Sequence, residues 1–296
     1  MSGSVRPYRA PLRSRLAGLI FVAPGVLWLA VFFLVPLVMI LLVSIGSPDD
    51  LGHTTLVNPN LDQYARALGE DAFIPQLFRS LRYAAITTVL SLVIGYPIAY
   101  WIAMYGGKRK ALLLILVMLP FWTSYLIRTY AWMIILRDNG VLNSLLQAVG
   151  IGSEDDPLLL LNTDFAVILG MTYGFLPFTI LPLYVSIDRL DRNLVQAARD
   201  LYSSGREAFI HVTLPLTMPG VIAGALLTFI PAIGDYVTPD LLGGADTSTI
   251  AKSVQTIFTV GRDWGYGSAL GFLLMIVTLG GTLAALRWVR KETLGG

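Results

Sequence analysis

The chain has 296 residues, of which 55% are hydrophobic and only 14% are charged, whereas a typical soluble domain has roughly 25% charged residues. Several apolar runs exceed the ~18 residues that indicate a bilayer span, so a soluble globular protein is excluded. The chain has no cysteine and only two histidines, which excludes disulfide scaffolds, thiolate metal sites and a histidine metal cage. The sequence therefore predicts a polytopic membrane protein.

Six apolar runs predict an all-α membrane protein with a single transmembrane domain over residues 16–290. The expected spans are residues 16–45, 84–103, 111–136, 165–187, 219–236 and 269–289. The first run is longer than the roughly 7–15 apolar residues of a cleaved signal peptide, so we expect it to be retained.

Lysine and arginine predict the orientation of these spans, because they concentrate in cytoplasmic loops. The N-terminal tail, the links after spans 2 and 4, and the C-terminal end from Arg287 onward hold 14 of the 21 basic residues. The opposite loops hold six, together with most of the acids, including Asp49, Asp50, Glu70 and Asp71. Both the N-terminal tail, 1–15, and the C-terminal tail, 291–296, are therefore predicted to be cytoplasmic.

Two local patterns concern helix ends and helix contacts. Asn60 is placed to cap a short helix that runs through Leu68. Glycines four residues apart permit close contact between helices; such pairs occur at Gly170/Gly174, Gly220/Gly224 and Gly267/Gly271.

The link between spans 4 and 5, residues 188–218, is much longer than a turn requires. Apolar residues recur in it at helical spacing, at Leu190, Leu194, Ala197, Ala198 and Leu201. Ser203, Ser204 and Gly205 predict a break, and Pro215 and Pro219 predict the end of a second short helix. The pattern indicates an amphipathic helix, a bend and another short helix; a helix that lies in the lipid headgroups is the alternative.

The same link carries a family signature. Its stretch Gln196-Ala-Ala-Arg-Asp-Leu201, followed by Gly205 and then Leu214-Pro-Leu-Thr-Met-Pro-Gly220, resembles the EAA loop of ABC-importer permeases. The resemblance implies a type I permease fold and contact with an ATPase. It assigns that contact to Gln196, Ala197, Ala198, Arg199, Asp200, Gly205, Leu214 and Pro215. Two residues depart from the usual pattern, namely Gln196 in place of Glu and Tyr202 in place of Gly.

Further motifs favour one branch of that family. Residues 80–84, 95–97 and 119–128 fit the family in general, whereas residues 230–244 and 262–264 look like the spermidine/putrescine branch. The resemblance therefore implies a polyamine or a similar small organic cation as the solute. An amino-acid derivative, an opine and thiamine are alternative solutes.

The chain contains no G-x-x-x-x-G-K-[ST] phosphate loop, so we expect it to be a non-catalytic subunit without a cofactor of its own. The resemblance implies two separate ATP-binding subunits that bind ATP and magnesium, a second permease subunit and an extracytoplasmic solute-binding protein. It implies location in the bacterial inner membrane, in contact with lipid, and no nucleic-acid partner.

Span 3 carries an aromatic and polar face. Trp122, Tyr125, Thr129 and Trp132 are spaced by three, four and three residues and are predicted to share one side of a helix, with Arg128 beside it. Two interpretations of Arg128 are open, because a buried unpaired arginine is costly in a membrane. It either faces a wet internal path and pairs with an acid, or reaches the outer headgroups.

The end of span 5 is a second candidate for the translocation path. Asp235, Tyr236 and Asp240 follow Pro231 and Gly234, where a broken helix would be expected. These residues are predicted to form an outer gate, with an interfacial acid that caps the next turn as the alternative.

Two other classes of function are less well supported. A self-contained secondary transporter usually needs carboxylates inside its spans and often has an inverted repeat, and neither is evident here. An intramembrane enzyme lacks a candidate base, because neither His53 nor His211 falls within a span.

Overall fold

The computed structural model describes residues 22–48, 54–55, 59–69, 73–153, 156–201 and 204–294. Outside these ranges lie the predicted N-terminal tail, 1–15, the first residues of span 1, 16–21, the end of the C-terminal tail, 295–296, and the acids Asp49, Asp50, Glu70 and Asp71. Within them the fold is helical, apart from a two-stranded antiparallel ribbon of β1 (Ser47–Pro48) and β2 (Thr54–Thr55).

Five of the described helices are long and apolar enough to cross a membrane. They are Val22–Ser44, which ends as α2 (Val35–Ser44), α4 (Phe73–Tyr105), α8 (Asp164–Asp188), Gly205–Ile233, which ends as α11 (Leu214–Ile233), and α14 (Trp264–Leu294). A bent pair, Gly107–Trp122 and Tyr125–Ile135, supplies a sixth span when it is counted as one. The predicted all-helical class is confirmed, whereas the cytoplasmic position of the termini stays a prediction.

Short helices connect the long ones. They are α3 (Asp62–Gly69), α7 (Val141–Ala148), α9 (Arg192–Leu201), α10 (Gly205–Ala208), α12 (Val237–Leu241) and α13 (Ile250–Thr256). The short helix expected after Asn60 is α3, and the Asn60 side chain accepts a hydrogen bond from the Asp62 N–H at 3.1 Å, as predicted.

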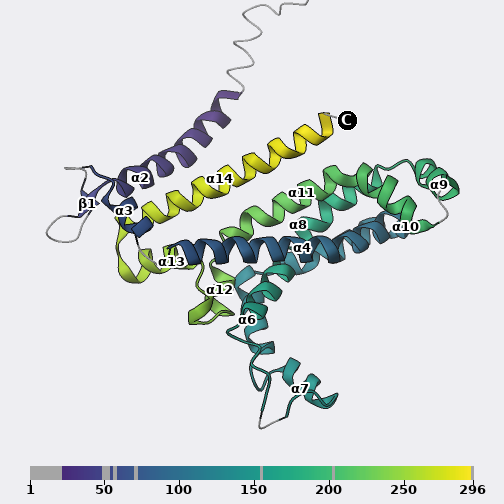
Figure 1. Cartoon of the computed structure of the whole chain (residues 1–296), viewed down its shortest axis with the longest axis horizontal. Helices are drawn as coiled ribbons and strands as arrows, with labels where there is room; N and C mark the ends of the chain where they lie inside the picture. The colour runs from purple at the N-terminus through teal and green to yellow at the C-terminus, as the bar shows by residue number, and fades with distance from the viewer. Residues whose placement is uncertain are drawn as a thin grey trace, which may run out of the picture.

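The core lies where α4, α8 and α11 pack together (Figure 1). Tyr83 of α4, Met171 of α8 and Ile233 of α11 belong to one buried apolar cluster. Small residues bring the helices close: a Cβ at Gly220 would lie 2.3 Å from that of Ser186, and a Cβ at Gly224 would lie 3.1 Å from the carbonyl oxygen of Thr179. The predicted close contacts are thus confirmed for this pair. Gly271 differs, because nothing described lies within 4 Å of its Cβ position.

Span 3 is not the straight helix expected over residues 111–136. It consists of α5 (Lys110–Met118), a short 3₁₀ turn η3 (Leu119–Trp122) and α6 (Tyr125–Ile135), with a bend of 83°. Pro120 lies in the turn, and its carbonyl oxygen accepts hydrogen bonds from the N–H and the hydroxyl of Thr123. Thr123 itself is extended, with φ −85° and ψ 151°, so the helix cannot continue through it.

The expectation that Pro215 and Pro219 end a helix is wrong, because both lie within the helix that continues to Ile233. A π-helical turn, η4 (Phe209–Thr213), directly precedes Pro215, and the Leu214 N–H bonds to the Phe209 carbonyl. The Thr217 hydroxyl also donates to the Thr213 carbonyl at 2.9 Å. Such local adjustments supply hydrogen bonds where a proline removes a donor.

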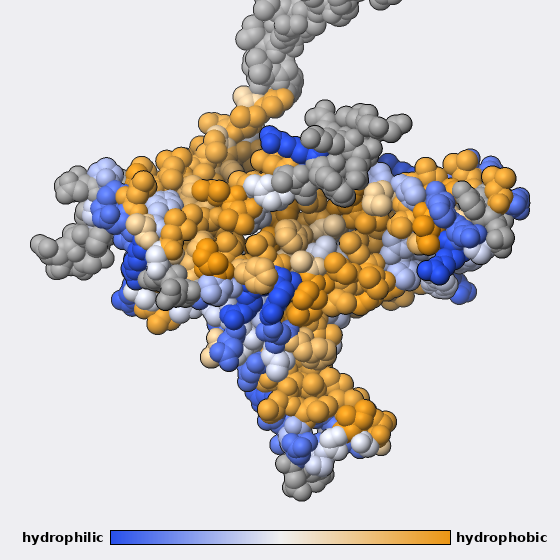
Figure 2. All heavy atoms as spheres, viewed as in Figure 1, coloured by the Kyte–Doolittle hydropathy of each residue, from blue (hydrophilic) through white to orange (hydrophobic). Residues whose placement is uncertain are grey.

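The surface matches a membrane protein. Figure 2 shows hydrophobic residues over the middle of the long helices and hydrophilic residues toward the two ends of the elongated body. No residue in the most apolar window of Val22–Ser44 is buried. This helix lies beside α14, while α6 and α7 extend away from the body (Figure 1). Apolar surface exposed on this scale marks contact with lipid or with another protein.

Candidate functional site

Four of the eight predicted path residues from spans 3 and 5 meet at one open cavity of about 400 Å³. We call it the Arg128 cavity. It is lined by residues of η3, α6, α8 and the segment that joins α11 to α12, among them Phe121, Tyr125, Arg128, Phe178, Asp235 and Tyr236. Tyr125, Arg128, Asp235 and Tyr236 were expected in the path from the sequence, and the fold brings all four together.

Asp235 is the buried acid of this cavity, with 8% of its surface exposed. Its Oδ1 accepts hydrogen bonds from the N–H groups of Val237 and Thr238 at 3.0 and 3.2 Å. Its Oδ2 accepts from the hydroxyls of Tyr125 and Thr238 at 2.5 and 2.6 Å. Asp235 therefore caps the first turn of α12 and also ties that turn to α6 through Tyr125.

Arg128 is positioned by aromatic rings rather than by an acid. Its guanidinium carbon lies 5.6 Å from the ring centroid of Phe121 and 5.5 Å from that of Tyr125. Its Nε and Nη1 are buried and have no hydrogen-bond acceptor among the described residues. The expected pairing of Arg128 with an acid is therefore not found within the described part of the chain, and the carboxylate that lines the cavity, that of Asp235, accepts its four hydrogen bonds from other donors.

The other predicted path residues lie elsewhere. The expected common helical face is wrong for Trp122, because the bend after η3 separates it from α6; its side chain is 75% exposed. Thr129 is buried and its hydroxyl donates to the Tyr125 carbonyl at 2.9 Å. Trp132 packs edge-on against Tyr173 of α8, with ring centroids 5.5 Å apart.

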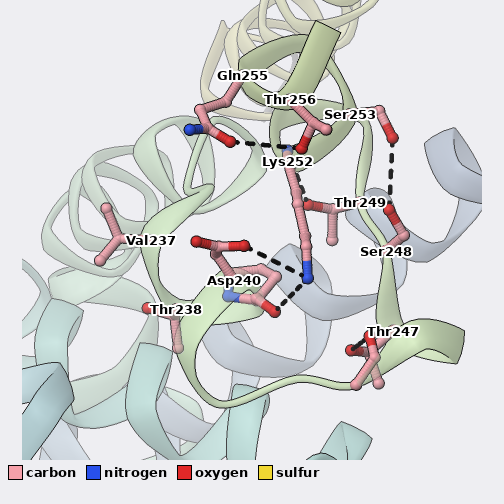
Figure 3. Close-up of polar contacts among 12 residues, drawn as sticks. Val237, Thr238, Asp240, Thr247, Ser248, Thr249, Lys252, Ser253, Gln255 and Thr256 are labelled. Carbon is pink, nitrogen blue, oxygen red and sulfur yellow. Dashed lines mark hydrogen bonds and ion pairs between the residues drawn. The ribbon is translucent and has the colours of Figure 1, made fainter. Parts of the chain in front are cut away.

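Asp240 does not line the cavity. Its carboxylate forms an ion pair with the Lys252 ammonium at 3.5 Å, which joins α12 to α13, as Figure 3 shows. The Lys252 ammonium also donates to the Pro239 carbonyl at 3.4 Å. Asp240 thus stabilises the segment after span 5, whereas Asp235 belongs to the cavity itself.

The sequence did not single out the contribution of α8. Phe175 and Phe178 line the cavity, and their rings lie 6.3 Å apart. Gly174 lets Tyr125 approach, because a Cβ there would lie 2.8 Å from the Tyr125 ring. The small-residue pair Gly170/Gly174 was a usable signal for this close approach, but it did not identify the partner helix.

The predicted ATPase-coupling segment lies beside the C-terminal end of α4 and the N-terminal end of α11, away from α12 (Figure 1). It comprises α9 and α10, and on α9 Gln196, Ala197 and Asp200 are exposed. The side chains of Ala198 and Arg199 and the residues Tyr202 and Ser203 lie outside the described part. The break expected before Gly205 is present, and the Ser204 hydroxyl caps α10 by accepting from the Glu207 N–H at 3.2 Å.

Aromatic contacts attach this segment to the body. The ring of Phe209, directly after α10, packs edge-on against Tyr96 of α4 with centroids 5.4 Å apart. Leu214 is half-buried and Pro215 is exposed at the start of α11. Because α10 continues through η4 into α11, the segment is joined to a membrane span without a break in the helix.

The fold and the cavity are those of a multi-pass membrane protein, with long apolar helices, one bent span, an exposed helical link and an open cavity of mainly apolar lining. The chain belongs to the family of binding-protein-dependent transport system inner membrane components, whose family model matches residues 91–290. It is therefore a multi-pass inner-membrane permease component of an ABC importer, and the resemblance noted in the sequence is confirmed.

Two similar proteins belong to the spermidine/putrescine branch of this family. The spermidine/putrescine transport system permease protein PotB of Salmonella typhimurium strain LT2 is 41% identical over 261 residues, covering 88% of this chain and 89% of the relative. PotB of Escherichia coli K12 is 42% identical over 250 residues, covering 84% and 90%. Among solved structures, a bacterial ABC transporter involved in import of the polysaccharide alginate matches with a TM-score of 0.76. That match covers 94% of this chain and 96% of the other at 16% identity, which establishes a shared fold.

Proposed function

We propose that this permease imports a polyamine, spermidine or putrescine, or a closely similar small organic cation. The observation that carries the proposal is identity of 41–42% to PotB proteins over most of both chains. The Arg128 cavity is compatible with this solute class, because aromatic residues line it, namely Phe121, Tyr125, Phe175, Phe178 and Tyr236. Cation–π contacts contribute about 0.5–2 kcal/mol each to binding of an ammonium group.

The transporter would contain, besides this chain, a second permease subunit, two ATP-binding subunits and an extracytoplasmic solute-binding protein. ATP and magnesium would bind to the ATP-binding subunits and not to this chain. Closure of those subunits on ATP would move α9 and α10, and the spans would then change between inward- and outward-open states. Such coupling requires that contacts differ between the two states.

The exposed surface of α9 supports this assignment. Leu194 and Leu201 are 50% and 83% exposed in the single chain, so α9 offers apolar surface to a partner. An ATPase subunit that receives α9 in a groove would cover them.

The test is uptake by the complete transporter in proteoliposomes, with ATP available to the ATP-binding subunits and the solute-binding protein supplied outside. Labelled spermidine or putrescine should accumulate, and unlabelled polyamine should compete while thiamine and amino-acid derivatives should not. Vesicles that contain this permease alone, and complete vesicles without ATP, are the controls. Accumulation of thiamine or of an opine without any polyamine uptake would contradict the proposed solute.

A further inference from the structure

Arg128 is the one charged side chain with buried nitrogens that lack a hydrogen-bond partner among the described residues; the other unsatisfied buried atoms belong to neutral side chains. A guanidinium has five N–H donors and cannot lose its charge. The rings of Phe121 and Tyr125 stabilise its charge partly through their faces, but they accept no strong hydrogen bond. The site of Arg128 is therefore incomplete in the single chain.

Neither Asp235 nor Asp240 supplies the acceptor that Arg128 lacks. Asp235 shares the cavity, yet its two oxygens already accept four hydrogen bonds and form no ion pair with Arg128. Asp240 is engaged with Lys252. Rearrangement of Asp235 toward Arg128 would leave the two N–H groups in the first turn of α12 without their acceptor, which is unfavourable for buried polar groups.

We infer that a carboxylate of the second permease subunit enters the open side of the Arg128 cavity and forms an ion pair with Arg128 across the interface between the two subunits. Carboxylate is the planar acceptor that matches the guanidinium fork. The inference rests on the proposed function, because it needs the second permease subunit of that assembly.

The solute class favours a protein carboxylate over an anionic solute. An unpaired arginine beside the path would repel a polyamine, whereas a paired arginine would present no net charge to it. The same pair would also give the two permeases a fixed register, since oppositely charged groups at an interface favour one arrangement of the partners. Arg128 thus acts on the path by positioning the second subunit.

The absence of cysteine from this chain permits a direct test. Arg128→Cys gives this permease a single thiol, and in a cysteine-free second permease each membrane-embedded Asp or Glu is changed to Cys in turn. An Arg–carboxylate pair holds its two Cα atoms farther apart than the roughly 4.4–6.8 Å that a disulfide allows, so a short bifunctional thiol reagent is applied to the assembled transporter in its membrane. This reagent should crosslink Arg128→Cys to one such position. Ile127→Cys, which lies on α6 but outside the cavity and is 66% exposed, should not crosslink to that same position.

Charge exchange gives a second readout. Arg128→Glu should weaken co-purification of the second permease by about 30-fold or more, as observed for buried charge pairs at interfaces. Changing the crosslinked acid of the second permease to Arg should restore both assembly and uptake, whereas a second permease with that change alone should be defective.

Several results would overturn the inference: no acid position crosslinks to Arg128→Cys, or Arg128→Met assembles and transports like the unchanged protein. Retention of phospholipid by the unchanged permease but not by Arg128→Met, without a crosslink, would assign the site to a lipid phosphate instead. Loss of transport of an anionic solute in Arg128→Met would assign it to the solute. Crosslinking does not depend on which solute is carried, so failure of the inference and failure of the polyamine assignment are separate outcomes.

Discussion

The Arg128 cavity and the α9–α10 segment differ in how completely one chain determines them. At the cavity, Asp235 is buried and four donors from α6 and α12 fix its position. At α9, the exposed residues include two leucines as well as polar side chains. The attachment of this segment to the body is made by Phe209 against Tyr96 and Tyr100.

This difference separates a cavity whose hydrogen bonds form within one chain from a helix, α9, whose leucines stay exposed in that chain. The cavity has its internal hydrogen bonds in place and lacks only a partner for Arg128. On α9, Leu194 and Leu201 stay exposed in the single chain, and the proposed function assigns their cover to an ATP-binding subunit. We therefore expect changes in α9 to abolish transport without unfolding the permease, and changes at Asp235 to reduce its stability.

The largest effect is expected from Ala197→Glu on α9. A carboxylate forced into a covered apolar contact has no partner, which is costly. The ATP-binding subunits should no longer co-purify, and ATP-driven uptake should fall to the level of vesicles without transporter. The thermal midpoint of the permease in detergent should stay unchanged, since Ala197 is exposed in the single chain.

Ala148→Glu is the matched control, because Ala148 is also an exposed alanine near the end of a short helix, α7, at a different part of the molecule. It should leave the ATP-binding subunits attached. Normal uptake by the Ala197→Glu transporter would refute the coupling role of α9.

The next effect is expected from Asp235→Ala. The change leaves two backbone N–H groups and one hydroxyl without an acceptor, because the hydroxyls of Tyr125 and Thr238 lie 2.6 Å apart and one can still donate to the other. Each buried group that water cannot reach costs about 1–3 kcal/mol. Because the cavity is open and water can satisfy part of this set, we expect a loss of about 3 kcal/mol in the free energy of unfolding. Denaturant unfolding in detergent measures it.

Asp240→Ala serves as the comparison for that prediction. Asp240 is exposed and forms one ion pair with Lys252, and exposed pairs of this kind contribute about 0–1 kcal/mol. Equal losses of stability in the two variants would mean that the Asp235 network is not what holds α12 against α6.

Gly220→Ala tests the close packing that links the two regions through α8 and α11. Its Cβ would lie 2.3 Å from the Ser186 Cβ and 2.9 Å from the Pro182 carbonyl, so the helices must separate, at about 1–3 kcal/mol. Gly271→Ala, with nothing described within 4 Å, should instead raise stability by up to about 1 kcal/mol through helix propensity. Thermal midpoints of the permease in detergent should move in opposite directions; a shift of the same sign in both would contradict this packing.

Hydropathy predicted the spans well but not their ends. The extension of α4 back to Phe73 was missed because its first turns contain polar residues, which distant partners satisfy: Ser80 accepts from the Ile250 N–H and Arg79 donates to the Ser248 carbonyl. The bend of span 3 was missed because a proline alone does not specify one. Pro97 stays inside α4, whereas Pro120 lies in the turn that precedes the bend.

The candidate site was predictable at those residues whose side chains are unusual in a membrane helix. Arg128, Tyr125, Asp235 and Tyr236 stood out by residue type and position, and the fold places them together. Phe178 did not, because a phenylalanine in a span is ordinary and its contact with Phe121 depends on how α8 packs against η3. The packing of α8 against η3 is a tertiary contact, and the spacing of residues along one helix does not predict it.

The smallest effect is expected from the ion pair between Lys110 and Asp188. It joins the start of α5 to the last residue of α8, just before α9, and both side chains are partly exposed, at 23% and 36%. Such a pair should contribute no more than about 1 kcal/mol and should weaken in about 1 M salt, where the screening length is near 3 Å. A double-mutant cycle of Lys110→Ala and Asp188→Ala, read by denaturant unfolding at low and high salt, measures the coupling.

Lys108→Ala is the control, since Lys108 is exposed and forms no ion pair within the described residues. A salt-insensitive coupling well above 2 kcal/mol would mean that the body fixes the start of the coupling segment as firmly as α6 and α12 fix Asp235, and the contrast between the two regions would then fail.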